Sequence, residues 1–309
     1  MVQGMDPILL HVRKVWDFSP HCSMTDMIRY HEQLLLTFRE SDTHEKGENG
    51  RIRILASPNG IEWKSLVLLE EEGEDLRDPK LSVMPNGQLL LLVGSITPER
   101  AHTRLYISAE GTIWTPIMCD VPAQEWLWRI AWYNGEAYGV SYNYSEPPEW
   151  TVTLWKSADA SHWVRMTPFM IEGKPNECTL RFDYEGTMYA LLRRAKRGDN
   201  RSFWGMSPSA YEDWLWRSLR YNLGGPNFLI TPQGRFLAAG RQGLPTPYGY
   251  VEQVILLEIK PDAENFLLSF PSSGDSGYPG MVLDQDRLWL SYYSSHEGST
   301  AVYLAEVAL

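Results

Sequence analysis

The chain has 309 residues, a formal net charge of −11, and a composition that is 43% hydrophobic and 12% aromatic. A large buried core is therefore expected, and the acidic balance argues against nucleic acid as a partner, because phosphate binding needs a basic face. No apolar run approaches the length of a membrane span, and the first 33 residues carry charges throughout, so we expect no membrane segment, no signal peptide and a cytoplasmic location.

A predicted apolar strand at Ile8–Val12 precedes six similar hairpin units. Each unit has a polar entrance, a short apolar strand, a turn, a second apolar strand and a polar exit. The steps between the first residues of successive units are 54, 50, 51, 49 and 50 residues. Repetition at this period indicates an array of small sheets. The units are His21–Glu40, Asp75–Ser95, Glu125–Asn143, Asn176–Arg194, Gly225–Gln242 and Asp275–Ser295.

A second hairpin follows each unit, and its turn carries the most regular motif of the sequence. A serine, a short polar residue, a glycine or alanine, and a tryptophan recur with one spacing. The serine can bond the turn backbone and the tryptophan can pack between sheets, so we interpret these turns as structural. The copies are Ser57–Trp63, Ser108–Trp114, Ser157–Trp163 and a looser one at Ser207–Trp214.

Six repeats of four strands predict an all-β protein, a six-bladed β-propeller that forms one domain over residues 1–309. The first strand of each repeat is expected to line the central channel. The last repeat has only three strands of its own, so we expect the strand at Ile8–Val12 to complete it and close the ring.

The tryptophan turns resemble the Asp-box, and together with six blades they resemble the sialidase superfamily. Two stretches carry the resemblance further. Asn176-Glu177-Cys178, followed 16 residues later by Arg193, looks like the sialidase glutamate and its carboxylate-binding arginine. Ser276–Val282, which includes Tyr278, stands where exo-sialidases place a nucleophilic tyrosine. The resemblance implies a sialidase-like, retaining glycoside hydrolase that acts on a terminal, acidic sugar.

The implied mechanism is intelligible from the residue types. An anionic nucleophile would be repelled by the carboxylate of an acidic sugar, whereas a neutral Tyr278 activated by Glu177 avoids that cost. Arginines would clamp the substrate carboxylate through paired hydrogen bonds. Arg39, Arg193 and Arg241 stand at the exits of units one, four and five, and we expect all three at one end of the channel.

The sequence also departs from the family pattern. Unit one begins with His21-Cys-Ser-Met-Thr-Asp26 in place of the Arg-Ile-Pro triplet that supplies a clamp arginine. Asp42 and His44 compete for the place of the family's acid. Asp78 is a further candidate, either as the acid or by tuning a neighbour, and Arg77 beside it is either a substrate-binding residue or part of an internal ion pair.

Several other large or polar side chains are candidates for binding the sugar. Trp128 and Arg129 stand at the entrance of unit three, where aromatic rings can stack on sugar faces or simply pack between blades. The end of the last apolar strand is unusually polar, and Tyr293, His296 or Glu297 is expected at the rim of the pocket.

Two other functions remain open. One is an inverting or phosphorolytic propeller glycosidase that uses Asp26, Asp78 and Glu177. The other is a carbohydrate-binding propeller without catalysis. In each case we expect a small-molecule or glycan partner and no cofactor. The three cysteines and seven histidines are scattered along the chain, so no metal site is predicted, and the oligomeric state stays open.

Overall fold

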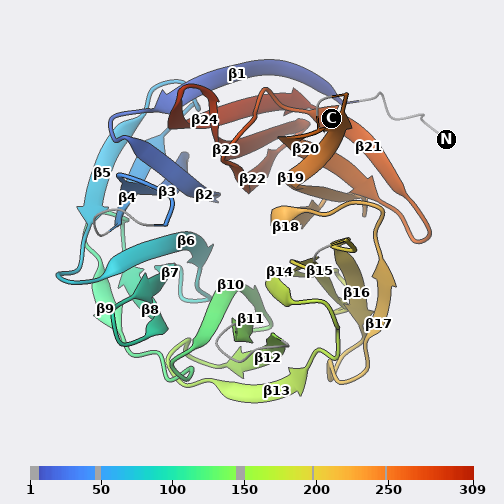
Figure 1. Ribbon diagram of the computed structural model, residues 1–309. Coiled ribbons are helices and arrows are strands. Elements are labelled where there is room, and N and C mark those ends of the chain that lie inside the picture. The colour runs from blue at the N-terminus through green and yellow to red at the C-terminus, as the bar shows by residue number, and fades with distance from the viewer. Residues whose placement is uncertain (1–6, 46–49, 144–149, 197, 248) are drawn as a thin grey trace.

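The computed structural model describes residues 7–45, 50–143, 150–196, 198–247 and 249–309. These residues form strands β1 to β24 and no helix, so none of them belongs to a helix that could cross a membrane. The strands form six antiparallel blades arranged in a ring around a central axis (Figure 1). The predicted six-bladed, all-β propeller is confirmed.

The blades follow one another along the chain, each beginning with the strand nearest the channel. Blade one consists of β2 (His21–Tyr30), β3 (Gln33–Ser41), β4 (Arg51–Ser57) and β5 (Lys64–Leu69), and blade two of β6 (Asp75–Val83), β7 (Leu89–Ile96), β8 (Ala101–Ser108) and β9 (Thr115–Ile117). Blade three consists of β10 (Glu125–Tyr133), β11 (Glu136–Asn143), β12 (Thr151–Ser157) and β13 (Val164–Pro168), and blade four of β14 (Pro175–Phe182), β15 (Met188–Arg194), β16 (Phe203–Ser207) and β17 (Leu215–Ser218). Blade five consists of β18 (Gly224–Ile230), β19 (Phe236–Thr246), β20 (Gly249–Ile259) and β21 (Glu264–Ser269), and blade six of β22 (Ser276–Asp284), β23 (Arg287–Glu297) and β24 (Ser299–Ala308).

The N-terminal strand closes the ring, as the sequence predicts. Strand β1 (Ile8–Trp16) pairs antiparallel with β24 and becomes the outermost strand of blade six. A single parallel bridge between His21 and Thr300 joins blade six to blade one. The two ends of the described chain are therefore held in one sheet, and the outer edge of β24 is covered.

We expect removal of β1 to destabilise the propeller strongly. Leu9, Val12, Val15 and Trp16 are partly buried against the cores on either side of blade six. At roughly 1 kcal/mol for each half-buried side chain, deletion of residues 1–16 should cost about 4 kcal/mol and lower the midpoint of thermal unfolding by about 10 °C. A deletion that stops at residue 6 keeps all four side chains and is the control. Equal melting curves for the two deletions would contradict the closure.

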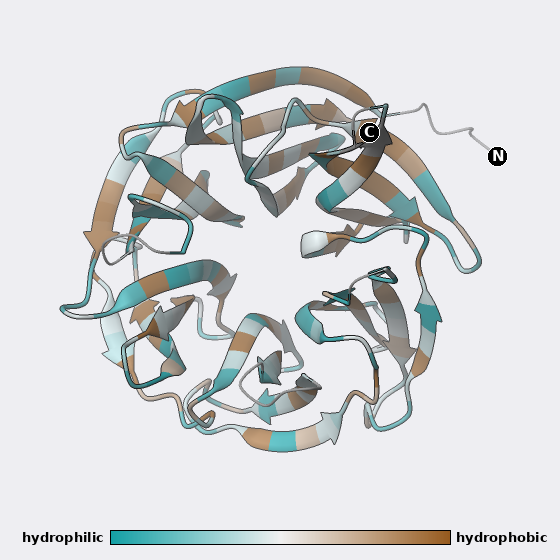
Figure 2. Cartoon of the chain, in the orientation of Figure 1, coloured by the Kyte–Doolittle hydropathy of each residue, from teal (hydrophilic) through white to brown (hydrophobic). Residues whose placement is uncertain are grey.

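The core lies between adjacent blades. One cluster joins Leu237 and Leu256 of blade five to Leu288 and Tyr292 of blade six, and the other blade interfaces are built in the same way. Figure 2 shows hydrophobic segments along the strands of every blade. The blades are thus rigid supports for the residues that face the channel.

The tryptophan turns support these interfaces. In the first of them, the Ser57 Oγ accepts a hydrogen bond from the Gly60 backbone N–H at 2.9 Å, and the Trp63 indole donates to the Gly60 carbonyl at 3.3 Å. Trp63 packs against the core between blades six and one. The contacts of this turn are those of a structural element on the outside of the ring.

Each inner strand contains an irregularity at the same place. Its pairing with the second strand of the blade shifts, which leaves two residues without a partner in the ladder. Such bulges bend a strand and re-aim its side chains, and they often occur beside active sites. The six pairs are Met24–Thr25, Asp78–Pro79, Trp128–Arg129, Asn176–Glu177, Gly225–Pro226 and Tyr278–Pro279.

Candidate active site

The channel has a different cavity at each end. Residues near the beginning of the inner strands line one cavity of about 300 Å³, whereas residues near the ends of these strands line another of about 690 Å³. We call the first the entrance pocket and the second the far cavity. The entrance pocket is lined by Met24, His44, Arg77, Asp78, Ile96, Trp126, Tyr142, Trp150, Asn176, Glu177, Arg193, Ala195 and Tyr278.

Glu177 and Tyr278 are in direct contact at the base of the entrance pocket. The phenol of Tyr278 donates a hydrogen bond to Oε1 of Glu177 at 2.7 Å, although the two residues are 101 positions apart. Both side chains are almost fully buried. Burial raises the pKa of Tyr278 well above its ordinary value, and the negative charges of Glu177 and Asp78 add to this shift. The phenol is therefore neutral at rest and has a carboxylate beside it to take its proton.

Gly225 makes this pair possible. Its backbone N–H donates to Oε2 of Glu177 at 2.7 Å. It has φ of +60°, and a Cβ at this position would lie 2.7 Å from the ring of Tyr278. Only glycine combines this backbone conformation with so close an approach. Gly225 is a site residue that the sequence prediction did not include, and the signal that could have found it is the Gly224-Gly225-Pro226 stretch at the start of the fifth unit.

The backbone conformation is also unusual at one aspartate and one tyrosine of the pocket. Asp78 and Tyr278 have φ of +48° and +51°, in the left-handed region that non-glycine residues rarely adopt. Both belong to the bulges of their inner strands. Strained residues of this kind persist where the surrounding structure fixes them, and they gather at functional sites. The bulges thus turn Asp78 and Tyr278 towards the same pocket.

Arg193 completes the contacts of Glu177. Its Nη1 donates to Oε1 of Glu177 at 2.6 Å, and its side chain is 21% exposed. Burial alone would lower the pKa of Arg193, but the Glu177 carboxylate outweighs this effect and raises it, so the guanidinium remains charged. Glu177 therefore accepts hydrogen bonds from Tyr278, Arg193 and the backbone of Gly225, which fix its orientation.

Asp78 is the buried carboxyl group of the pocket. It is 6% exposed, and its Oδ1 has no hydrogen-bond partner among the described residues. Burial raises the pKa of Asp78; the Lys80 ammonium opposes this shift, and the charge of Glu177 adds to it. A carboxyl group with a raised pKa keeps its proton to higher pH, which is the property that a general acid needs.

Lys80 and Trp128 form a layer beneath the pocket. The Nζ of Lys80 lies 4.7 Å from the centre of the Trp128 ring and 5.7 Å from that of Tyr278. Burial lowers the pKa of Lys80 to about 8. Trp128 is 1% exposed, so it supports Tyr278 from below and does not present a surface for stacking on a sugar. Besides Tyr278 and His44, the rings that line the pocket are Trp126, Tyr142 and Trp150.

His44 and Tyr293 are linked through Asp275. The Nδ1 of His44 lies 2.8 Å from Oδ2 of Asp275, and the phenol of Tyr293 donates to Oδ1 of the same carboxylate at 3.0 Å. Burial alone would raise the pKa of Asp275, but its contacts with His21 and His44 lower it. Tyr293 is fully buried and packs against Tyr278 with ring centres 5.8 Å apart, so it lies behind the pocket and not at its rim.

Other predicted residues take structural roles. Arg39 is fully buried, and its guanidinium bonds Asp75, Ser41 and nearby carbonyl groups, so the expectation that it clamps a substrate is wrong. Asp42 is exposed and does not line the entrance pocket. Of the two candidates for the position of the family's acid, only His44 lines the pocket. Arg77 does line the pocket, and it also pairs with Asp75 at 2.6 Å.

Arg241 and His296 lie outside the lining of the pocket. Arg241 bonds the Ser276 carbonyl at 3.3 Å and pairs with Glu252 at 3.5 Å, close behind Tyr278. His296 is hydrogen-bonded to Ser294 at 3.0 Å and packs on the ring of Tyr303, and it is not among the residues that line the pocket. Of the three expected clamp arginines, Arg193 alone lines the pocket.

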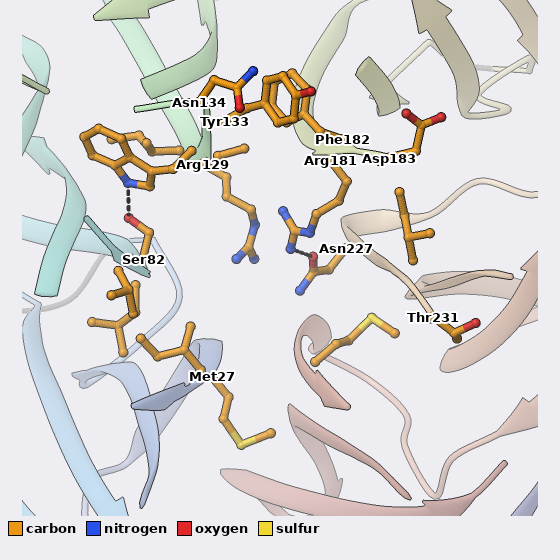
Figure 3. A pocket seen from close by; sticks show the side chains of 18 of the residues that line it. Met27, Ser82, Arg129, Tyr133, Asn134, Arg181, Phe182, Asp183, Asn227 and Thr231 are labelled. Atoms are coloured by element: carbon orange, nitrogen blue, oxygen red, sulfur yellow. Dashed lines mark hydrogen bonds between the residues drawn. The ribbon is translucent and has the colours of Figure 1, made fainter. Parts of the chain in front are cut away.

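The far cavity holds Arg129, which the sequence places with the sugar-binding residues. Its Nη1 contacts both oxygens of Asp26 at 2.8 and 2.9 Å. Figure 3 shows Arg129 and Arg181 pointing into this cavity, with Arg181 bonded to Asn227 at 2.9 Å. Neither Asp26 nor Arg129 lines the entrance pocket, so Asp26, Asp78 and Glu177 do not form one carboxylate site.

No protein-family model matches the chain, and no curated protein matches its sequence. Solved structures do match it. A protein of unknown function from Dyadobacter fermentans has 17% identity and a TM-score of 0.83, with 98% of this chain and 99% of that chain covered. The GH93 α-L-arabinofuranosidase of Fusarium graminearum, in complex with arabinobiose, has 13% identity and a TM-score of 0.71, with coverage of 94% and 93%. Trypanosoma rangeli sialidase has 13% identity and a TM-score of 0.73, with 93% of this chain and 54% of that chain covered. At these identities the likeness establishes the fold, which this chain shares with six-bladed propellers of the sialidase and arabinofuranosidase type.

Proposed function

We propose that the protein is a retaining glycoside hydrolase that removes a terminal sugar in the entrance pocket. The observation that carries this proposal is the hydrogen bond of 2.7 Å between the buried phenol of Tyr278 and Glu177, with the buried carboxyl group of Asp78 lining the same pocket. A nucleophile, its base and an acid are the groups that a two-step glycosidase needs. The solved glycosidases that share the fold support this reaction class.

In the first step, Glu177 takes the phenolic proton and the Tyr278 oxygen bonds the anomeric carbon. The glycosidic C–O bond breaks, and Asp78 gives its proton to the leaving oxygen. In the second step, Asp78 takes a proton from water, the hydroxide attacks the anomeric carbon, and the bond to Tyr278 breaks. Glu177 then returns the proton to the phenolate, so the enzyme ends as it began.

An acidic sugar fits this chemistry best, because a neutral phenol approaches it without charge repulsion. We assign the substrate carboxylate to Arg193, which lines the pocket, and Arg241 behind Tyr278 adds a second positive charge. The pocket volume of about 300 Å³ is at the small end for ligand sites and suits one sugar residue.

A neutral sugar is the second candidate. The observation that favours it is that Arg77 and Arg193, the two arginines of the lining, are already paired with Asp75 and Glu177. With no substrate charge to repel it, Glu177 itself could attack, and Tyr278 would then only orient the carboxylate.

Trapping of the covalent intermediate distinguishes these candidates. A panel of aryl glycosides that includes sialosides and arabinofuranosides identifies the hydrolysed sugar, and the matching fluorinated glycosyl fluoride then labels the nucleophile. We expect mass spectrometry of the digested protein to find the sugar on Tyr278. A label on Glu177 would support the neutral-sugar mechanism. If no glycoside were hydrolysed, the remaining hypothesis would be a carbohydrate-binding propeller without catalysis.

A further inference from the structure

Two histidines and a carboxylate meet beside the entrance pocket. His21 begins β2, His44 follows β3, and Asp275 precedes β22, so blades one and six both contribute. Nε2 of His21 and Nδ1 of His44 each lie 2.8 Å from Oδ2 of Asp275. The ligand atoms of all three side chains lie within 4.8 Å of one another, which is close enough for a single ion to reach all of them.

The surrounding contacts hold these three residues in place. The second oxygen of Asp275 accepts a hydrogen bond from Tyr293, and the Asp275 backbone carbonyl accepts one from Ser295 at 3.1 Å. The backbone carbonyl of His44 accepts a hydrogen bond from the buried Arg39 at 3.5 Å. Outer contacts of this kind orient the ligands of a metal ion and raise its affinity.

The donor set indicates the class of ion. Imidazole nitrogens suit Zn²⁺, Fe²⁺ and other transition metals, whereas Ca²⁺ and Mg²⁺ are bound mainly through oxygen. Three protein ligands also leave at least one position of a tetrahedral ion open, as in catalytic zinc sites. The single carboxylate balances part of the charge of a divalent ion, and the two imidazoles bind in their neutral form.

We propose that His21, His44 and Asp275 form a site for one divalent transition-metal ion, for which Zn²⁺ is the reference. His44 lines the entrance pocket, so the ion would add positive charge at the edge of the pocket, a charge that the buried Arg39 does not provide. Binding of the metal does not depend on the proposed hydrolase function, because it can be measured without any sugar.

The test is calorimetric titration of the EDTA-treated, dialysed protein with ZnCl₂, with CaCl₂ as the comparison. We expect one Zn²⁺ per chain and a higher melting temperature on its addition. His21→Ala and Asp275→Asn should each lower the Zn²⁺ affinity at least about 100-fold, because each removes one of three ligands. His44→Ala, at a side chain that is 32% exposed, should do the same with little risk to folding.

His162→Ala is the matched control. The Nδ1 of His162 lies 2.7 Å from Oδ2 of Asp159, so it forms a histidine–carboxylate pair of the same kind, but it lies on the surface and belongs to no cluster of three such ligands among the described residues. This variant should bind Zn²⁺ like the wild type. Absence of binding by the wild type at 1 mM ZnCl₂, equal binding by the three ligand variants, or a preference for Ca²⁺ would overturn the proposal. Melting curves without metal show whether each variant is folded.

Discussion

Tyr278→Phe should lower kcat/KM by at least about 10³-fold on the substrate that the glycoside panel identifies, because it removes the attacking oxygen. The Phe ring keeps the packing of Tyr278 against Trp128 and Tyr293, and Glu177 keeps its bonds to Arg193 and Gly225. The dissociation constant for a non-hydrolysable analogue should therefore change less than about 3-fold. Steady-state kinetics and calorimetry measure the two quantities.

The control for this variant is Tyr106→Phe. Tyr106 is also a buried tyrosine, and its phenol donates to Oε1 of Glu71 at 2.8 Å, but it lies in β8, outside the entrance pocket. It loses the same kind of phenol–carboxylate bond and should keep full activity. If Tyr278→Phe lost only about 10-fold, the value expected for one hydrogen bond to a charged group, the nucleophile would be Glu177 and not Tyr278.

The propeller could be predicted because its evidence is repeated along the chain. The six hairpin units follow one another at nearly constant steps, and the tryptophan turns recur with them. Every unit therefore indicates the same kind of four-stranded blade, so a wrong assignment in one unit does not change the predicted fold. The closing strand followed from the same count, since the last unit lacks one strand. The repeat period indicates which residues belong to the same sheet, and this information was sufficient to predict the fold.

The contact between Glu177 and Tyr278 was implied by the resemblance to sialidases, and both residues stand near the start of an inner strand. The arginines at the exits of the second strands could not be placed in this way. Arg39 and Arg193 occupy similar positions in blades one and four, yet Arg39 is buried against Asp75 and Arg193 lines the pocket. Arg39 is held by a carboxylate of the next blade, whereas the partner of Arg193 is Glu177 of its own blade, and periodicity does not tell these two cases apart.

The bulges explain the remaining errors. Trp128 and Arg129 share one bulge, but Trp128 packs against Lys80 and Tyr278, whereas Arg129 bonds Asp26 and lines the far cavity. Strict alternation along a strand does not predict the directions of two residues where the ladder is interrupted. His21, His44 and Asp275 were likewise scattered in the sequence, and only the junction of blades one and six brings them together.

Asp78→Asn should make the protein more stable and much less active. Because burial raises the pKa of Asp78 in the folded state, the folded protein holds this proton more tightly than the unfolded chain. The wild type therefore loses stability as the pH rises from the unfolded value, about 3.9, through the folded pKa. The asparagine side chain does not titrate and tolerates a positive φ, so the gain in melting temperature should grow with pH over this window.

Asp26→Asn is the opposite case, because it leaves Arg129 buried without its carboxylate and should destabilise the fold by about 3 kcal/mol or more.

The loss of activity in Asp78→Asn should depend on the leaving group, which separates an acid from a residue that only positions others. Alcohol leaving groups need a proton as the glycosidic bond breaks, so their kcat/KM should fall by about 10²- to 10⁴-fold. Aryl leaving groups of low pKa depart without that proton and should lose far less in the first step. In the wild type, kcat/KM for the alcohol substrates should fall as the pH rises through the raised pKa of Asp78, and the variant should lose this limb of the pH profile. An equal loss for both leaving groups, with the wild-type pH profile retained, would assign the acid to another residue, and His44 on the same pocket wall is the next group to test.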